Sequence, residues 1–193
     1  SSSSVAASTH VSRARVAVEH STRSGGSFDS ASHRPAGVAS AQDAMIAAIK
    51  AQHDMIKTNL VKSAAKVSEA DYAFKPTPEV RSFGQIVGHI ANANYMICSV
   101  ALGEQSPSRE NIEQARTTKA PLVEAVKASF TYCDRAYAKR DAELTAQANL
   151  FGMEMSRLGV LAFNAAHDYE HYGNIVTYMR LKGMTPSSSA GEN

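Results

Sequence analysis

The sequence predicts an all-α protein, a four-helix bundle with a disordered N-terminal tail. Three observations support this fold class. Four stretches repeat apolar side chains at the spacing of one helix face. Prolines, glycines or polar loops separate these stretches. No stretch shows a convincing strand pattern, and no segment repeats another. Amphipathic helices of this kind, joined by loops, bury their apolar faces against one another as a bundle.

The tail comprises residues 1–38, in which Ser, Ala, Gly and Arg dominate and no apolar face recurs. Such a segment buries too little apolar surface to offset the entropy lost on ordering, so we expect disorder. A Ser- and Arg-rich, acid-poor composition also fits a transit-type leader or a cloning remnant. The bundle is expected over residues 39–186 and a flexible C-terminal tail over residues 187–193.

The first helix is expected from Ala39 onward. Its apolar face contains Met45, Ile49, Ile56, Leu60 and Val67. Pro76 and Pro78 then interrupt the helical pattern, and Ser82 is a favourable N-cap for the next helix.

The second helix is expected to follow Ser82 and to end near Gly103. Its inward residues are Phe83, Ile86, Ile90, Ile97 and Val100. A polar loop over residues 104–117 leads to the third helix, which begins near Pro121, because proline is favoured in a first turn. The inward residues of the third helix are Leu122, Val126, Ser129, Cys133 and Tyr137.

The last helix is expected from Met155 to Lys182, before Gly183 and Pro186. One stripe along it contains Val160, Phe163, His167, His171, Ile175 and Tyr178.

Charge and hydropathy exclude two classes of partner. The tail has four arginines and two acidic residues, so the rest of the chain has 16 basic and 16 acidic residues and is neutral. A neutral body lacks the basic surface that binds a phosphate backbone, so we expect no nucleic-acid partner. No apolar run approaches the roughly 18 residues of a membrane span. The cellular location stays open, with the cytoplasm favoured over export.

Cys98 and Cys133 lie too far apart in the sequence for a local metal knuckle. In a reducing compartment they would be small buried thiols, and this is the favoured interpretation. In an exported chain they could form a disulfide if their helices are neighbours.

Three histidines are predicted to face the bundle interior. His167 and His171 are four residues apart, so they share a helix face within the apolar stripe. His89 lies about 60° from Ile86 on the second helix and also borders the core. Each could be an ordinary hydrogen-bonded core histidine. However, three buried imidazoles each need a partner, and one shared cation satisfies all three. His89, His167 and His171 are therefore the predicted metal ligands.

The letters HDYEH at residues 167–171 also match the inverted metalloprotease signature, with Glu170 as general base. That site needs a distant acidic ligand and a larger α/β fold, neither of which is evident. Glu170 also lies about 100° around the helix from His171. The protease interpretation is therefore rejected.

Three segments resemble the DinB/YfiT-like metalloprotein superfamily over residues 40–186. They are YAFKPTPEVRSFGQIVGHIANAN at 72–94, HDYEHYGNIVTYMRLKG at 167–183, and the closing GMTP. A tryptophan is common in the family where Phe74 stands. The resemblance implies an up-down-down-up bundle, often a homodimer. It also implies a divalent ion, Zn or Ni, held by the three histidines. Characterised relatives include S-transferases and isomerases that use a low-molecular-weight thiol, mycothiol or bacillithiol.

The predicted function is a metal-dependent thiol S-transferase or hydrolase that acts on a small-molecule substrate. Three neutral imidazoles leave a coordination position open, at which a thiol can ionise or a water can lose a proton. Glu170 and His53 are the candidate acid–base residues, whereas Asp168 is expected to be solvated or capping. The alternative is a stress-response bundle that binds metal or small molecules without turnover. A fourth protein ligand, or a seal formed by Met153 and Met155, would favour that alternative.

Overall fold

The computed structural model describes residues 41–191, and they form the predicted four-helix bundle. Its long helices are α1 (Ala41–Lys66), α2 (Phe83–Leu102), α4 (Lys119–Tyr137) and α6 (Arg157–Leu181). The tail predicted to be disordered, residues 1–38, lies outside the described residues.

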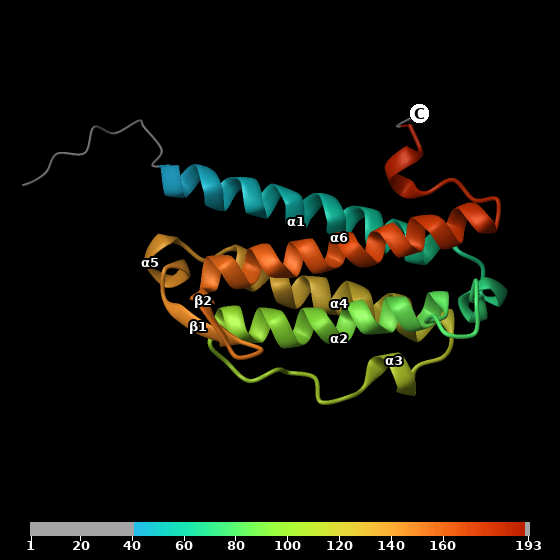
Figure 1. Ribbon diagram of the computed structural model, residues 1–193, viewed down its shortest axis with the longest axis horizontal. Helices are drawn as coiled ribbons and strands as arrows, with labels where there is room; N and C mark the ends of the chain where they lie inside the picture. The colour runs from blue at the N-terminus through green and yellow to red at the C-terminus, as the bar shows by residue number, and fades with distance from the viewer. Residues whose placement is uncertain (1–40, 192–193) are drawn as a thin grey trace, which may run out of the picture. The chain divides into compact units, whose positions relative to one another are not determined.

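The four helices have the up-down-down-up order that the family resemblance implies. α1 and α6 run in one direction, and α2 and α4 run in the other (Figure 1). Each of α1 and α2 packs against both α4 and α6, so α1 and α2 are diagonal to each other. The connection that contains α3 (Ile112–Ala115) runs back along α2, which allows α4 to start at the same end of the bundle as α2.

Local capping explains where α2 and α6 begin. The Ser82 hydroxyl accepts a hydrogen bond from the Gln85 amide, and the Gln85 side chain accepts one from the Ser82 amide. This capping box satisfies two amide groups that a helix start leaves free. α2 ends at Gly103, whose φ of 73° is in the left-handed region that favours glycine. Ser156 caps α6 in the same way by accepting from the Gly159 amide.

The connections contain further short elements: η1 (Ala70–Ala73), α5 (Asp141–Leu144), β1 (Gln147–Leu150), β2 (Met153–Ser156) and η2 (Ser187–Ser189). The antiparallel β1–β2 hairpin is a correction to the sequence prediction, which had no strand. Its two-residue turn places Phe151 and Gly152 at φ 54° and 83°, as a type I′ turn requires. The Asn149 side chain accepts a hydrogen bond from the Gly152 amide at 2.9 Å. Phe151 occupies a turn position where asparagine or aspartate is usual, so the sequence signal was weak.

Two clusters of buried side chains fill the space between the helices. The predicted inward residues Ile56, Leu60 and Ile90 are at most 1% exposed. Met45 is a correction, because it is 56% exposed, and Ile46 and Ile49 form the packed face at that end of α1. Among residues 41–191, no helix combines the length and the apolar character that crossing a membrane requires.

Cys98 and Cys133 form a disulfide between α2 and α4, with their Cα atoms 5.3 Å apart. The favoured interpretation as free thiols was therefore wrong. The two helices pack directly against each other, and this adjacency brings together two cysteines that are 35 residues apart.

The predicted C-terminal tail begins with η2. The Ser187 hydroxyl lies 3.1 Å from the Ser63 hydroxyl on α1, and the Ser188 amide donates to the Tyr172 hydroxyl at 2.9 Å. These contacts join the start of this segment to α1 and α6.

Candidate metal centre

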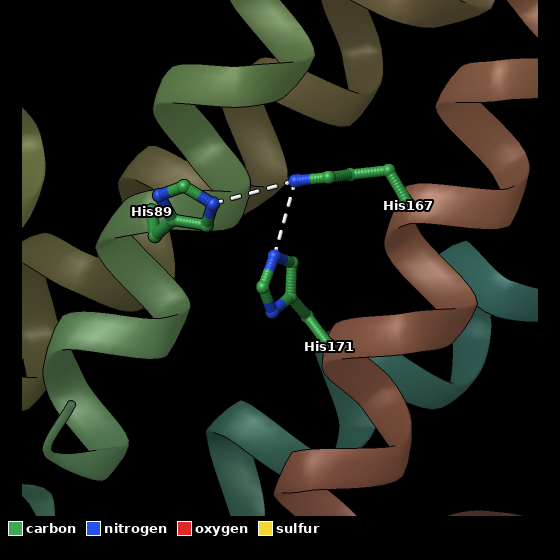
Figure 2. Close-up of side chains that lie close together, drawn as sticks. All are labelled: His89, His167 and His171. Atoms are coloured by element: carbon green, nitrogen blue, oxygen red, sulfur yellow. Dashed lines mark hydrogen bonds between the residues drawn. The ribbon is translucent and has the colours of Figure 1, made fainter. Parts of the chain in front are cut away.

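Three histidines converge between α2 and α6, as Figure 2 shows. The Nε2 atom of His167 lies 3.3 Å from Nε2 of His89 and 3.0 Å from Nε2 of His171. The ring centroids of His89 and His171 are 4.6 Å apart. The structure thus brings together the three side chains that the sequence predicts as metal ligands.

The spacing of the three nitrogens suits a divalent ion. An ion bound tetrahedrally at about 2.0–2.1 Å from each nitrogen separates the nitrogens by about 3.4 Å. The measured separations of 3.0 and 3.3 Å are close to this value. Imidazole nitrogen is also a common zinc and nickel donor. The residues present therefore fit the ion that the family resemblance implies.

The outer nitrogens of the three rings have different surroundings. Nδ1 of His89 lies 3.2 Å from a carboxylate oxygen of Glu113. Because a carboxylate only accepts hydrogen bonds, a neutral His89 carries its proton on Nδ1 and its lone pair on Nε2. Nδ1 of His171 lies 3.4 Å from the Asn174 amide group. Nδ1 of His167 is buried and has no hydrogen-bond partner among the described residues.

Burial lowers the pKa of all three histidines. The pKa of His167 falls to about 4, first through desolvation and then through the neighbouring His171. Desolvation is also the main cause for His89, followed by the charge of Arg81, and for His171, followed by His89. The imidazoles are therefore neutral near pH 7, which is the form that binds a metal ion.

A pocket of about 430 Å³ opens beside one of the three histidines. His171 lines it, together with Arg81, Glu113, Asn174 and Tyr178. Neither Met153 nor Met155 lines this pocket, and among residues 41–191 the group of convergent ligand atoms contains the three histidines alone. Neither Glu113 nor Arg81 could be identified from the sequence, because a residue in a connection has no periodicity that indicates its neighbours.

Glu170 is exposed on α6, where the helical wheel puts it. Its negative charge partly offsets the lowering of the pKa of His167 and His171, so Glu170 lies within electrostatic range of the centre. No hydrogen bond joins it to the three histidines.

His53 lies in the bundle core. Its side chain is fully buried, its Nε2 lies 3.0 Å from Asp134, and its ring stacks on Tyr137 with centroids 3.8 Å apart. It belongs to a separate group with Asp54 and Asp134. Burial leaves His53 without access to a molecule in the pocket, which argues against an acid–base role there.

Asp168 was predicted to be solvated or capping, and this was wrong. It is fully buried, and neither carboxylate oxygen has a hydrogen-bond partner among the described residues. Burial raises the pKa of its carboxyl group well above the usual value. Asp168 lies one helical turn from both Asn164 and Tyr172, which are also buried, so the helix period could have revealed its inward position.

Comparisons with known proteins agree with this architecture. The uncharacterized protein YjoA of Bacillus subtilis (strain 168) is 26% identical over 127 residues, which cover 63% of this chain and 80% of YjoA. A crystal structure of a DinB-like protein from Bacillus cereus ATCC 10987 superposes with a TM-score of 0.65 at 18% identity, covering 73% of this chain and 95% of that one. The YjoA crystal structure has a TM-score of 0.56 at 19% identity, with 72% and 93% covered.

Because their sequence identity to this chain is low, these two crystal structures support the fold alone. The family itself is shown by sequence, since the DinB superfamily matches residues 38–175, which include His89, His167 and His171. The chain belongs to the DinB superfamily.

Proposed function

We propose that the chain is a metal-dependent enzyme, of the thiol S-transferase or hydrolase kind, that acts on a small molecule. The observation that carries this proposal is the convergence of three histidine Nε2 atoms, with one of these histidines, His171, lining a pocket. His89, His167 and His171 would hold the ion, with Zn or Ni as the expected metal.

The donor set favours catalysis over a purely structural role. Structural zinc sites usually have four protein ligands, whereas catalytic sites usually have three and an open position. When bound, the ion would supply Lewis acidity that favours the deprotonated form of a thiol or a water. Since His171 lines the pocket, a small molecule bound there would lie against one of the three proposed ligands.

The other pocket residues would bind and orient that molecule. The Arg81 side chain is 43% exposed, and its Nε donates a hydrogen bond to Glu113. Its terminal nitrogens can donate to a polar group of the bound molecule. The exposed amide of Asn174 can donate or accept. Glu170 is the acid–base candidate beside the centre, although its exposure argues for a small contribution.

The alternative, a bundle that binds without turnover, predicts a closed centre. Among the described residues, no fourth His, Cys, Asp or Glu joins the three histidines, and neither Met153 nor Met155 lines the pocket. Enzymatic function is therefore the better supported of the two.

The test has two stages. Purified protein, reconstituted with Zn²⁺ or Ni²⁺ and desalted, should retain close to one ion per chain by elemental analysis. The loaded protein should then be screened with low-molecular-weight thiols and electrophilic acceptors, and with ester and amide substrates. Failure to retain any divalent ion would contradict the metal centre. Retention without turnover across the screen would favour the binding alternative. Light scattering would test the homodimer implied by the family.

A further inference from the structure

The connection between α2 and α4 is held against the helix that carries His89. The Ile112 side chain is 1% exposed, and its amide donates to the Asn92 side chain at 3.0 Å. The Asn92 amide group in turn donates to the Asn111 side chain at 3.1 Å. Asn92 lies one turn beyond His89, so these bonds fix the start of α3 against the turn of α2 that follows His89. Figure 1 shows α3 beside α2.

Gly88 allows the connection to approach the helix this closely. A Cβ atom at Gly88 would lie 2.7 Å from the Cα of Glu113 and 3.0 Å from its nitrogen. Real side chains do not tolerate such a distance to backbone, so any larger residue would push α3 outward. The absence of a side chain at Gly88 therefore allows Glu113 to lie next to His89, the residue that follows Gly88.

The Glu113 carboxylate bridges two side chains. Its Oε2 lies 3.2 Å from Nδ1 of His89, and its Oε1 accepts a hydrogen bond from Nε of Arg81 at 2.8 Å. The Glu113 side chain is 20% exposed. Hydrogen bonds to a charged group are the stronger kind, and two of them on separate oxygens hold the carboxylate in one orientation.

We propose that Glu113 is a positioning residue, which fixes the tautomer and ring orientation of His89 and so presents its Nε2 to the metal centre. This inference rests on the proposed function, because it assigns His89 as a ligand. A histidine ligand that donates its other N–H to a carboxylate is a stronger and better-oriented donor. Three neutral imidazoles supply no negative charge to a divalent ion, and Glu113 places one just outside them. Arg81 holds that carboxylate on His89.

Two readouts on the metal-free protein test the proposal in the wild type, Glu113→Gln and Glu113→Ala. The first is Zn²⁺ affinity, measured by competition with a chromophoric chelator. The second is the His89 tautomer, measured by ¹⁵N NMR of the imidazole nitrogens. Glu110→Ala is the matched control, because Glu110 lies in the same connection but is exposed and pairs with Arg116 at 2.7 Å.

Glu113→Ala should weaken Zn²⁺ binding by about 10- to 100-fold, the usual cost of losing such a partner. It should also abolish the preference of His89 for a proton on Nδ1. Glu113→Gln should recover part of the affinity and the tautomer, because the amide oxygen still accepts from Nδ1–H. Glu110→Ala should match the wild type in both readouts.

An unchanged tautomer and affinity in Glu113→Ala would overturn the proposal. So would a melting temperature that falls together with affinity while the tautomer stays the same, since Glu113 would then only dock α3. If the wild type binds no Zn²⁺, the proposed function fails, and the tautomer still decides whether Glu113 orients His89.

Discussion

Nε2 of His89 on α2 lies 3.3 Å from Nε2 of His167 on α6, although the two residues are 78 positions apart in the sequence. α2 and α6 pack directly against each other, so the helix pair sets this distance. The centre is therefore organised by the bundle itself, and an ion would enter a site whose donors are already close to their final separation. Preorganisation of this kind makes each donor costly to lose.

We expect His89→Ala, His167→Ala and His171→Ala each to lower the bound divalent metal well below one ion per chain. Two remaining imidazoles are too few for tight binding. Elemental analysis after reconstitution and desalting checks this result. Thr177→Ala, at an exposed position on α6, is the control and should keep the ion. Full metal content in all three histidine variants would show that the ligands are assigned wrongly.

Features that depend on local spacing could be predicted from the sequence. His167 and His171 share a face because they are four residues apart, and the start of α2 at Ser82 and its end at Gly103 follow from capping chemistry. Contacts between distant segments could not be predicted in this way. The disulfide depends on α2 lying beside α4, and the Glu113–His89 contact depends on how the connection docks.

The error at Asp168 has a physical cause. Asp168 is a polar residue near an apolar face, and a polar side chain is usually exposed there. The helix period places Asp168 inward, and residue type outweighed that period in the prediction. Buried ionisable groups of this kind are uncommon, so a pattern based on typical exposure misses them.

Removing the disulfide should destabilise the bundle. The bond closes a loop with a sequence separation of 35, for which the chain-entropy model gives about 3–4 kcal/mol. Cys98→Ala/Cys133→Ala should therefore unfold at a lower denaturant concentration than the oxidised wild type, as measured by circular dichroism. A reductant should lower the midpoint of the wild type and leave that of the double variant unchanged. Equal midpoints for oxidised wild type and double variant would contradict this prediction.

Asp168→Asn should stabilise the metal-free protein at pH 8 and have less effect at pH 4. Burial raises the pKa of Asp168 in the folded state, so ionisation is penalised there. The contribution of this carboxyl to stability is full below its unfolded pKa of about 3.8 and is lost as the pH rises through the folded pKa. Asparagine cannot ionise and avoids that loss. Denaturant unfolding at pH 4, 6 and 8 checks the trend, and a variant less stable than wild type at pH 8 would point to a cationic partner of the carboxylate.

Glu170→Gln should retain the metal ion and change turnover little. Glu170 is exposed, and it acts on His167 and His171 only through its charge, which partly offsets the lowering of their pKa by burial. The two imidazoles are already neutral near pH 7, so losing that charge leaves their metal-binding form unchanged. A general base at this position would instead cost roughly 100-fold or more in rate when made an amide. Elemental analysis and turnover of the reconstituted protein separate these outcomes, with Glu113→Gln as the parallel substitution that should weaken binding. An ion lost from Glu170→Gln but retained by His89→Ala would restore the inverted protease-type site, in which the carboxylate of HDYEH belongs to the centre.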